Sequence, residues 1–140
     1  MLSGMIKTDL NIIKTDSGSV YHGLKNTDIG FNKFGEVYFS SIKPKSVKAW
    51  KLHKKMTLNI VVPVGKVRFA LFDDTEKKMV EVKIGQNDYK LLTIKPNTWY
   101  GFQGISNEIS LVANLTDMRH DEKEMSRQSD DFFPFNWSVK

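Results

Sequence analysis

The chain has 140 residues and no cysteine; 40% of its residues are hydrophobic and 26% are charged. This length and composition predict one globular domain of ordinary size, over residues 1–140. No apolar run approaches the roughly 20 residues that a membrane span needs, so we expect no membrane partner. The lack of cysteine excludes a disulfide scaffold and thiolate chemistry, and it favours a cytoplasmic location.

The net charge of +5 comes from 21 basic and 16 acidic residues that are unevenly spread. The segment Lys43 to Lys55 contains six lysines and no acid, whereas Asp117 to Asp131 is mostly acidic. Such a cationic patch suits a phosphate-bearing small molecule as well as a polynucleotide, and a merely solvated lysine face is the plainer alternative. Because Trp50 is the only aromatic residue in the run, we expect no nucleic-acid partner.

Short segments rich in β-branched and aromatic residues follow one another along the chain, separated by Gly, Pro, Asn and Asp. The strands we expect are Met5–Lys14, Ser19–Leu24, Glu36–Ile42, Val47–Trp50, Thr57–Pro63, Lys66–Asp73, Lys78–Ile84, Tyr89–Ile94, Trp99–Phe102 and Ser110–Leu115. Phe72 breaks the alternation of its segment, which predicts a strand covered on both faces. Roughly ten short strands at this spacing predict an all-β sandwich or barrel.

The C-terminal part has a different composition. Asp121 to Gln128 is the one segment that favours a helix, with acids near its start and Arg127 near its end. The tail Asp131 to Trp137, DFFPFNW, carries four aromatic residues in seven positions. An exposed patch of this size would promote aggregation, so we expect the tail to pack on its own barrel or on a neighbouring subunit.

The chemistry-bearing candidate is the stretch Val47 to Gly65, VKAWKLHKKMTLNIVVPVG, with Ile94 to Phe102, IKPNTWYGF, as its partner. It contains His53, and histidine is the side chain whose ordinary pKa of about 6.5 allows proton exchange near neutrality. A hydrogen-bonded structural histidine is the alternative. His120 is expected to serve as a cap or in a surface hydrogen bond.

Metal-binding jelly-roll barrels often combine His-x-His with a later glutamate and a third histidine on a distant strand, because alternate residues of a strand share a face. In this chain the corresponding positions hold Lys51, Leu58 and Tyr100. Leucine cannot coordinate a metal, and lysine normally carries a proton in place of a free lone pair. The sequence therefore predicts no bound metal and no cofactor.

The remaining groups suit proton transfer. Neutral His53 would accept a proton from a carbon next to a carbonyl, Lys51 would balance the charge on the enolate oxygen, and Tyr100 would return a proton. The alternatives are that Tyr100 is a wall of the barrel and that Lys51 is solvated. We further expect a substrate to contact five residues: Lys48, Trp50, Asn59, Arg68 and Trp99, of which Lys48 and Arg68 are candidates for a diphosphate.

Five segments, in this order, resemble the dTDP-4-dehydrorhamnose 3,5-epimerase-like (RmlC-like) branch of the cupin superfamily, and more closely its short sugar epimerases: FGEVYFS, VKAWKLHKKMT, PVGKVRFALFD, IKPNTWYGF and FPFNW. The resemblance covers about residues 5–137. It implies a cupin-type jelly-roll β-barrel, here with one short C-terminal helix, that forms a homodimer. It also implies a nucleotide-linked 4-keto-6-deoxy sugar as substrate, in cell-surface polysaccharide synthesis, with His53 as the base.

The family's partner tyrosine has no counterpart in Ser110 to Asp117, SLVANLTD, where Ala113 lies near its position. The family's nucleotide motif has become DSGSVYH, which keeps Asp16 and Gly18 but has no arginine. A one-centre epimerase, a keto-isomerase and a non-catalytic nucleotide-sugar or carbohydrate binding barrel all fit these departures.

Overall fold

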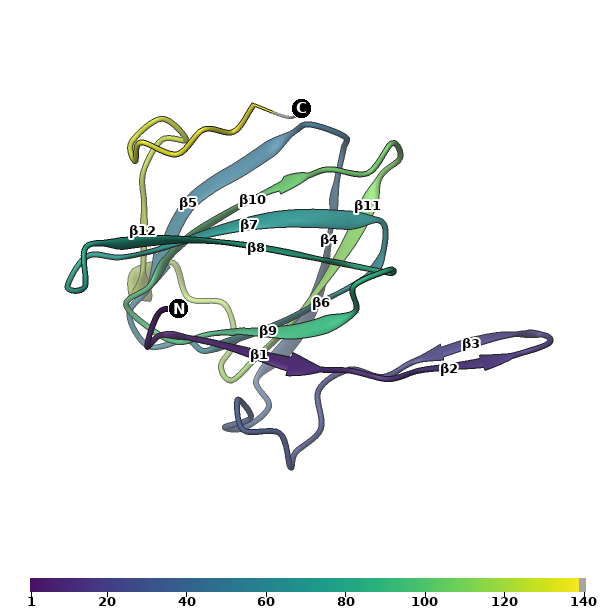
Figure 1. The fold of residues 1–140 in the computed structure, drawn as a ribbon. Coiled ribbons are helices and arrows are strands. Elements are labelled where there is room, and N and C mark those ends of the chain that lie inside the picture. Colours follow the sequence, from purple (N-terminus) through teal and green to yellow (C-terminus); the bar gives the residue numbers. More distant parts are fainter. Residues whose placement is uncertain (139–140) are drawn as a thin grey trace.

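The computed structural model, which describes residues 1–138, is built almost entirely of antiparallel strands (Figure 1). The strands are β1 (Met5–Asp9), β2 (Ile12–Thr15), β3 (Gly18–Tyr21), β4 (Glu36–Ile42), β5 (Val47–His53), β6 (Leu58–Val64), β7 (Lys66–Asp73), β8 (Lys78–Gly85), β9 (Lys90–Ile94), β10 (Trp99–Gly104), β11 (Ser110–Thr116) and β12 (Met125–Arg127). A single 3₁₀ turn, η1 (Glu122–Glu124), precedes β12.

Two five-stranded sheets form the body of the molecule. The first has the strand order β1-β9-β6-β11-β4, the second has the order β12-β5-β10-β7-β8, and β2 and β3 form a separate hairpin. These two antiparallel sheets confirm the predicted all-β jelly-roll architecture. The sheets do not join into one closed cylinder, so the barrel is open and has two layers.

The core lies between the inner faces of the two sheets. Alternate residues of each strand point to the same side, so Phe69 and Leu71 of β7 meet Ile60 of β6 and Val112 of β11 in one buried cluster. These side chains are at most 3% exposed. The opposite faces carry a different set of residues, and each is covered by a separate segment of the chain.

The loop before β4 covers part of the outer face of the first sheet. Asn59 donates to the carbonyl oxygen of Gly30 at 3.1 Å and accepts a hydrogen bond from the hydroxyl of Thr93 at 2.6 Å. A Cβ atom at Gly30 would lie 2.2 Å from that hydroxyl, so only glycine allows this close approach. Asn59 therefore ties the loop to the sheet.

The aromatic tail covers the outer face of the second sheet. The ring of Phe133 packs against Phe72, Trp50 and Trp99, at centroid distances of 4.7, 5.0 and 5.5 Å. The tail thus packs on its own barrel, which was one of the two expected arrangements. It also explains why β7 is apolar on both faces, as Phe72 indicated from the sequence.

The prediction of a helix over Asp121 to Gln128 is wrong. Only Glu122–Glu124 form a 3₁₀ turn, capped by the side chain of Asp121, and the residues that follow are extended and pair with β5. Met5–Lys14 is also two strands in place of one, and β5 continues to His53 in place of ending at Trp50. Within residues 1–138, the structure has no helix whose length and apolar content would suit a membrane crossing.

Candidate active site

His53, the last residue of β5, is 4% exposed and lies on the inner side of the second sheet. Its Nδ1 atom is hydrogen-bonded to Oε1 of Glu124. Its Nε2 atom is buried and has no hydrogen-bond partner among residues 1–138. Because the carboxylate accepts the proton on Nδ1, the lone pair of the neutral imidazole is on Nε2, which is what a general base requires.

Glu124 is held by several donors at once. Its Oε2 atom accepts hydrogen bonds from the backbone N–H groups of Lys55 at 3.0 Å and Met56 at 3.3 Å. Burial favours the neutral form of Glu124, but the hydrogen bonds from His53 and from these two backbone groups outweigh it and lower the pKa of the carboxyl below its ordinary value. The group is therefore a carboxylate at neutral pH.

Tyr100 lies beside the histidine. Its strand, β10, pairs with β5 so that Tyr100 is opposite Lys51, and its ring stacks on the imidazole at a centroid distance of 6.1 Å and an angle of 18°. Tyr100 is 6% exposed, and burial, with smaller contributions from Tyr38 and Glu124, raises its pKa. The phenol is thus protonated and can donate a hydrogen bond or a proton.

A second tyrosine faces the same interior from the first sheet. Tyr38 of β4 accepts a hydrogen bond from Nδ2 of Asn114 on β11 at 2.9 Å, which leaves its own O–H proton available. Burial raises the pKa of Tyr38. The side-chain oxygen of Asn114 is buried and has no partner among the described residues.

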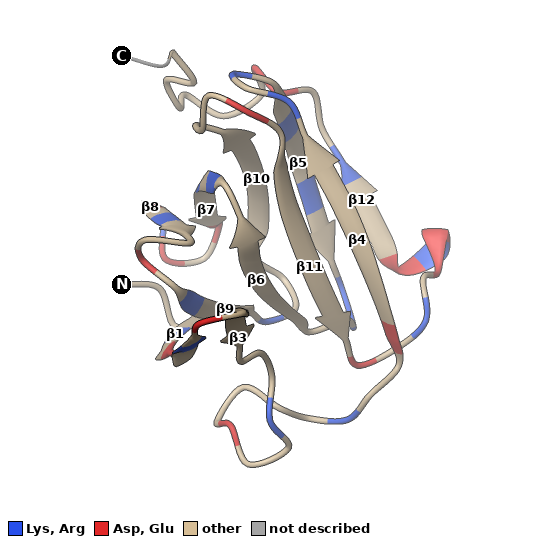
Figure 2. Ribbon diagram, turned by 90° about the vertical axis from the view of Figure 1, so that its right-hand side faces the viewer, with Lys and Arg blue, Asp and Glu red and all other residues tan. Residues whose placement is uncertain are grey.

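Three cations line the inner side of β5 and β12. The register between β5 and β10 shifts at Tyr100 and Gly101, so that Lys48 and Lys51, three residues apart, are opposite Phe102 and Tyr100 on one face. Arg127 of β12 pairs in register with Lys51. Figure 2 shows the basic residues along β5 and β12 and the acids of the turn that precedes β12.

These cations differ in their surroundings. Burial lowers the pKa of Lys51, and the positive charges of Arg127 and Lys48 lower it further. Lys48 donates to the carbonyl oxygen of Ser41 at 3.0 Å, and Arg127 forms a two-pronged ion pair with Glu122 at 2.6 and 3.1 Å. Lys51 is therefore the cation of the three without a hydrogen bond to residues 1–138.

The other predicted substrate contacts lie on outer faces. Trp50 is fully buried under the tail, where Nε1 donates to the carbonyl oxygen of Asp130 at 3.2 Å. Trp99 also packs against the tail, and Asn59 ties the loop before β4 to the first sheet. Arg68 lies under the tail as well. We predicted that these four residues contact the substrate. Their positions on the outer faces do not support contact with a ligand inside the barrel.

The metal question depends on the donor set. Among residues 1–138, no three His, Asp or Glu side chains lie close enough together to hold a metal ion. His53 and Glu124 are hydrogen-bonded to each other. The positions that the sequence comparison matched to further ligands hold Lys51, Leu58 and Tyr100. His120 is far more exposed and hydrogen-bonds to Glu122 at 3.1 Å, which confirms its expected place in a surface hydrogen bond.

Sequence reasoning missed Glu124, Tyr38 and Asn114. Tyr38 could have been found, because the alternation of Glu36–Ile42 places it on the same face as Ile42, which is buried. Ala113, the position compared with the family's tyrosine, points outward into a small cluster with Val61 and Leu91, and its neighbour Asn114 points inward.

The fold and the site together define a jelly-roll barrel of the RmlC-like cupin type, with a histidine–carboxylate pair, two tyrosines and a strip of cations inside. The family model described as "FdtA: WxcM-like, C-terminal" matches residues 4–137, and the chain belongs to this family.

Relatives of known structure or curated description agree. The structure of a dTDP sugar isomerase from Desulfovibrio desulfuricans G20 is 38% identical, with a TM-score of 0.91 over 96% of this chain and 91% of that chain. A probable low-salt glycan biosynthesis epimerase of Haloferax volcanii is 27% identical over 93 residues, or 62% of this chain. That match spans 60% of the relative's length, which is less than two thirds.

A more distant structure shows the same fold. It is a histidine-to-asparagine mutant of the 3,4-ketoisomerase QdtA from Thermoanaerobacterium thermosaccharolyticum in complex with TDP-4-keto-6-deoxyglucose, at 19% identity and a TM-score of 0.77 over 91% of this chain and 90% of that chain. The resemblance inferred from the sequence motifs is confirmed: the relatives are isomerases and epimerases, several of them of dTDP-linked sugars.

Proposed function

We propose that this protein is an isomerase or epimerase of a nucleotide-linked 4-keto-6-deoxy sugar in glycan biosynthesis, and that it works by removing a proton next to the keto group. The observation that carries the proposal is the buried pair of His53 and Glu124, which leaves Nε2 of the histidine as an unpaired base. The family and the 38% identical dTDP sugar isomerase support the substrate class.

In the first step, Nε2 of His53 takes a proton from the carbon next to the keto group. The electrons of the broken C–H bond move into the carbonyl and form an enolate. The imidazole becomes a cation, and the adjacent carboxylate of Glu124 stabilises it. A positioned base of this kind typically contributes about 10²–10⁴-fold to the rate.

The enolate oxygen needs a positive or hydrogen-bonding partner. Lys51 stands opposite Tyr100, and its side chain has no hydrogen bond to the described residues, so its ammonium is free to stabilise the negative charge. Tyr100 and Tyr38 both carry an available phenol proton. Return of the proton to the same carbon from the other side gives epimerisation. The keto group moves instead when the proton is delivered to the former carbonyl carbon, the hydroxyl on the first carbon loses its proton to become the new carbonyl, and the enolate oxygen takes up that proton to become a hydroxyl.

We place the diphosphate of the nucleotide along the cations of β5 and β12. Lys48 and Arg127 flank Lys51 on the inner side of these strands, and lysine and arginine are the usual partners of phosphate. We also propose that the reaction needs no metal, since the donor set at the site is histidine, lysine, tyrosine and one carboxylate. Enzyme treated with a chelator should retain its activity.

The test is exchange of the sugar's carbon-bound hydrogen with solvent deuterium, with dTDP-4-keto-6-deoxyglucose as substrate and NMR or mass spectrometry as the readout. The wild type should incorporate deuterium, and His53→Asn should lose at least about 10²-fold of the rate. His120→Asn, which changes an exposed histidine, is the matched control and should behave as the wild type. Undiminished exchange in His53→Asn would disprove the mechanism.

The alternative is a barrel that binds nucleotide sugars without turning them over. The family and the relatives do not favour it. It predicts ligand-induced thermal stabilisation of the wild type with no exchange at any sugar carbon. The same assay therefore separates the two functions, and the positions of the deuterium and of the keto group in the product separate epimerase from isomerase.

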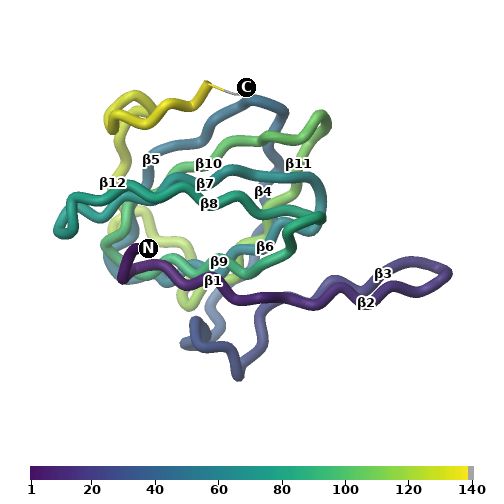
Figure 3. The backbone as a smooth tube through the Cα atoms, in the orientation of Figure 1, coloured from purple at the N-terminus to yellow at the C-terminus, as the bar shows by residue number. Residues whose placement is uncertain are grey.

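We propose further that the protein is a cytoplasmic homodimer. The β2–β3 hairpin projects from the barrel as an arm (Figure 3) and exposes Ile13, Val20 and Tyr21. On the outer face of β4, Val37 and Phe39 are 40% and 64% exposed. A second copy is the partner that would cover such apolar residues.

Analytical ultracentrifugation tests the dimer. Phe39→Glu should shift the protein toward the monomer, because a charge would be buried without a partner at the interface. Phe34→Glu, at a side chain of similar exposure (65%) in the loop before β4, is the control and should not change the mass. A wild-type protein that sediments as a monomer at all concentrations would refute the dimer.

A further inference from the structure

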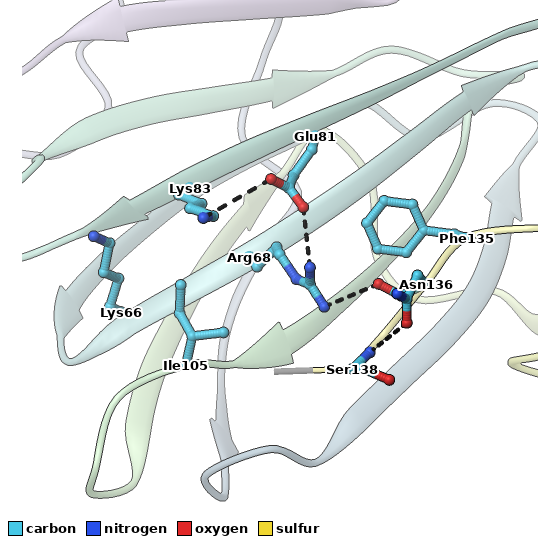
Figure 4. A pocket seen from close by; sticks show the side chains of 8 residues that line it. All are labelled: Lys66, Arg68, Glu81, Lys83, Ile105, Phe135, Asn136 and Ser138. Carbon is cyan, nitrogen blue, oxygen red and sulfur yellow. Dashed lines mark hydrogen bonds and ion pairs between the residues drawn. The ribbon is translucent and has the colours of Figure 1, made fainter. Parts of the chain in front are cut away.

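A hollow of about 550 Å³ lies on the outer face of the second sheet, between strands β7 and β8 and the returning tail (Figure 4). The proposed reaction does not use it, because the reacting groups point from the inner face of the same sheet. The volume is that of a typical small-molecule site.

The floor of the hollow is a rigidly held arginine. Arg68 donates through Nη2 to the side chain of Gln103 at 2.6 Å and to the carbonyl oxygen of Asn136 at 3.2 Å. The rings of Phe135 and Trp137 lie over its guanidinium, at 5.2 and 5.7 Å from Cζ to the ring centroids. The tail is thus fixed to the sheet, and the hollow exists before any ligand arrives.

The charges around the floor are not balanced. Arg68 pairs with Glu81 at 3.1 Å, so these two groups largely neutralise each other. Lys83 is 3.9 Å from the other oxygen of Glu81, and Lys66 has no ion pair with the residues that the structure describes. The positive charges of Lys66 and Lys83 therefore face the hollow, and the only carboxylate near them among residues 1–138, that of Glu81, already pairs with Arg68. This excess of positive charge favours an anion.

The opposite side supplies neutral and apolar groups. Figure 4 shows Phe135, Asn136 and Ser138 on one side of Arg68, and Lys66 with Ile105 on the other. An aromatic ring packs on the apolar face of a sugar, while an amide and a hydroxyl hydrogen-bond to its hydroxyl groups. These groups suit a hydroxylated ring.

One buried donor at this place is unused. Nε of Arg68 has no hydrogen-bond partner among residues 1–138. The side chain of Arg68 is only 12% exposed, and an unsatisfied buried N–H is rare and costly. An acceptor brought by a bound molecule, directly or through a water, would satisfy such a donor.

We propose that this hollow is a second binding site, for a small phosphate-bearing sugar. The phosphate lies between Lys66 and Lys83, and the sugar ring lies toward Phe135, with its hydroxyls on Asn136 and Ser138. The site is independent of the reaction proposed above, since it shares no residue with the inner face.

The test is a ¹H–¹⁵N NMR titration of the full-length protein with glucose 1-phosphate, with glucose and inorganic phosphate as separate probes. The sugar phosphate should shift the Nε–H signal of Arg68 and the amide signals of Lys66 and Asn136 in a saturable way. His53→Asn should show the same shifts, so the result does not depend on the reaction. Inorganic phosphate alone should act in the same place but more weakly.

The double variant Lys66→Ala/Lys83→Ala should bind at least about tenfold more weakly, since it removes both charge-assisted contacts. Lys7→Ala/Lys95→Ala removes two exposed lysines elsewhere and is the control, which should bind as the wild type. The proposal is overturned by the absence of a saturable shift, by equal binding of the two double variants, or by glucose binding as tightly as its phosphate ester.

Discussion

The carboxylate of Glu124 and the imidazole of His53, 71 residues apart in the chain, form one buried hydrogen-bonded pair. The same carboxylate accepts hydrogen bonds from two backbone N–H groups just after β5. Glu124 therefore fixes both the orientation of the histidine ring and the path of the chain that leaves it, and we regard it as a positioning residue for the base.

Glu124→Gln should lower kcat by about 10- to 100-fold with a smaller effect on KM, because the glutamine removes the charge that stabilises the imidazolium but keeps the shape. Steady-state kinetics checks this. Since the pKa of Glu124 is lowered in the folded protein, its carboxylate stabilises the fold above the unfolded value of about 4.3. That contribution is lost as the pH falls through the lowered pKa.

The melting temperatures of the wild type and Glu124→Gln should therefore differ most near neutral pH, and the difference should shrink in acid. A difference in melting temperature that grows on acidification would contradict the assignment of a carboxylate with a lowered pKa.

Tyr100→Phe should reduce turnover by about 10²-fold or more while KM and thermal stability change little, because the buried ring and its stacking on His53 remain. Tyr38→Phe leaves Nδ2 of Asn114 without its acceptor, so it should also cost stability, by about 1–3 kcal/mol. Paired measurements of kcat and chemical denaturation separate the two tyrosines. Wild-type turnover in both variants would show that neither phenol transfers a proton.

Lys51→Met should lose activity and gain thermal stability at neutral pH. Burial lowers the pKa of Lys51, so the folded state binds its proton less readily than the unfolded state. The free-energy cost of keeping Lys51 protonated in the folded state opposes folding in full at any pH below the lowered pKa. This cost decreases as the pH rises from the lowered pKa to the pKa of the unfolded state. Removal of the charge relieves it at all pH values.

Lys51→Arg provides the matching measurement. Arginine stays charged, so the alkaline fall in kcat/KM should move to higher pH than in the wild type, provided that the cationic side chain acts on the enolate. An unchanged alkaline limb would argue that Lys51 does not act through its charge.

Trp50→Ala should destabilise the fold by about 3–5 kcal/mol, because the fully buried indole fills the space between β5 and the aromatic tail. Urea denaturation measures this loss. Phe132→Ala, at a side chain that is 53% exposed, is the control within the same tail and should change stability by less than about 0.5 kcal/mol.

Much of this architecture was predictable from local pattern. The strands Glu36–Ile42 and Lys66–Asp73 have the bounds that their residues indicated. The apolar side chain of Phe72 correctly predicted that the outer face of β7 is covered. The wrong helix over Asp121 to Gln128 has a tertiary cause. Met125 and Arg127 pair with His53 and Lys51, and these contacts outweigh a weak helical preference.

The site was predictable only in part. His53 stood out by its chemistry, but no local signal linked it to Glu124, because the two meet only when the end of the chain returns to β5. Lys48 and Lys51 share a face only through the register shift at Tyr100, which breaks the period of two that sequence reasoning relies on. The positions of Arg68 and Trp50 depend on where the tail docks.

The short strand β12 has a consequence for local dynamics. It is the edge of the second sheet, and its three residues pair with the part of β5 that carries Lys51 and His53, directly after the turn that supplies Glu124. Local opening of this edge would separate the histidine from its carboxylate and Arg127 from Lys51 in one event. The protection of the β12 amides against hydrogen exchange therefore measures the fraction of molecules whose base is assembled.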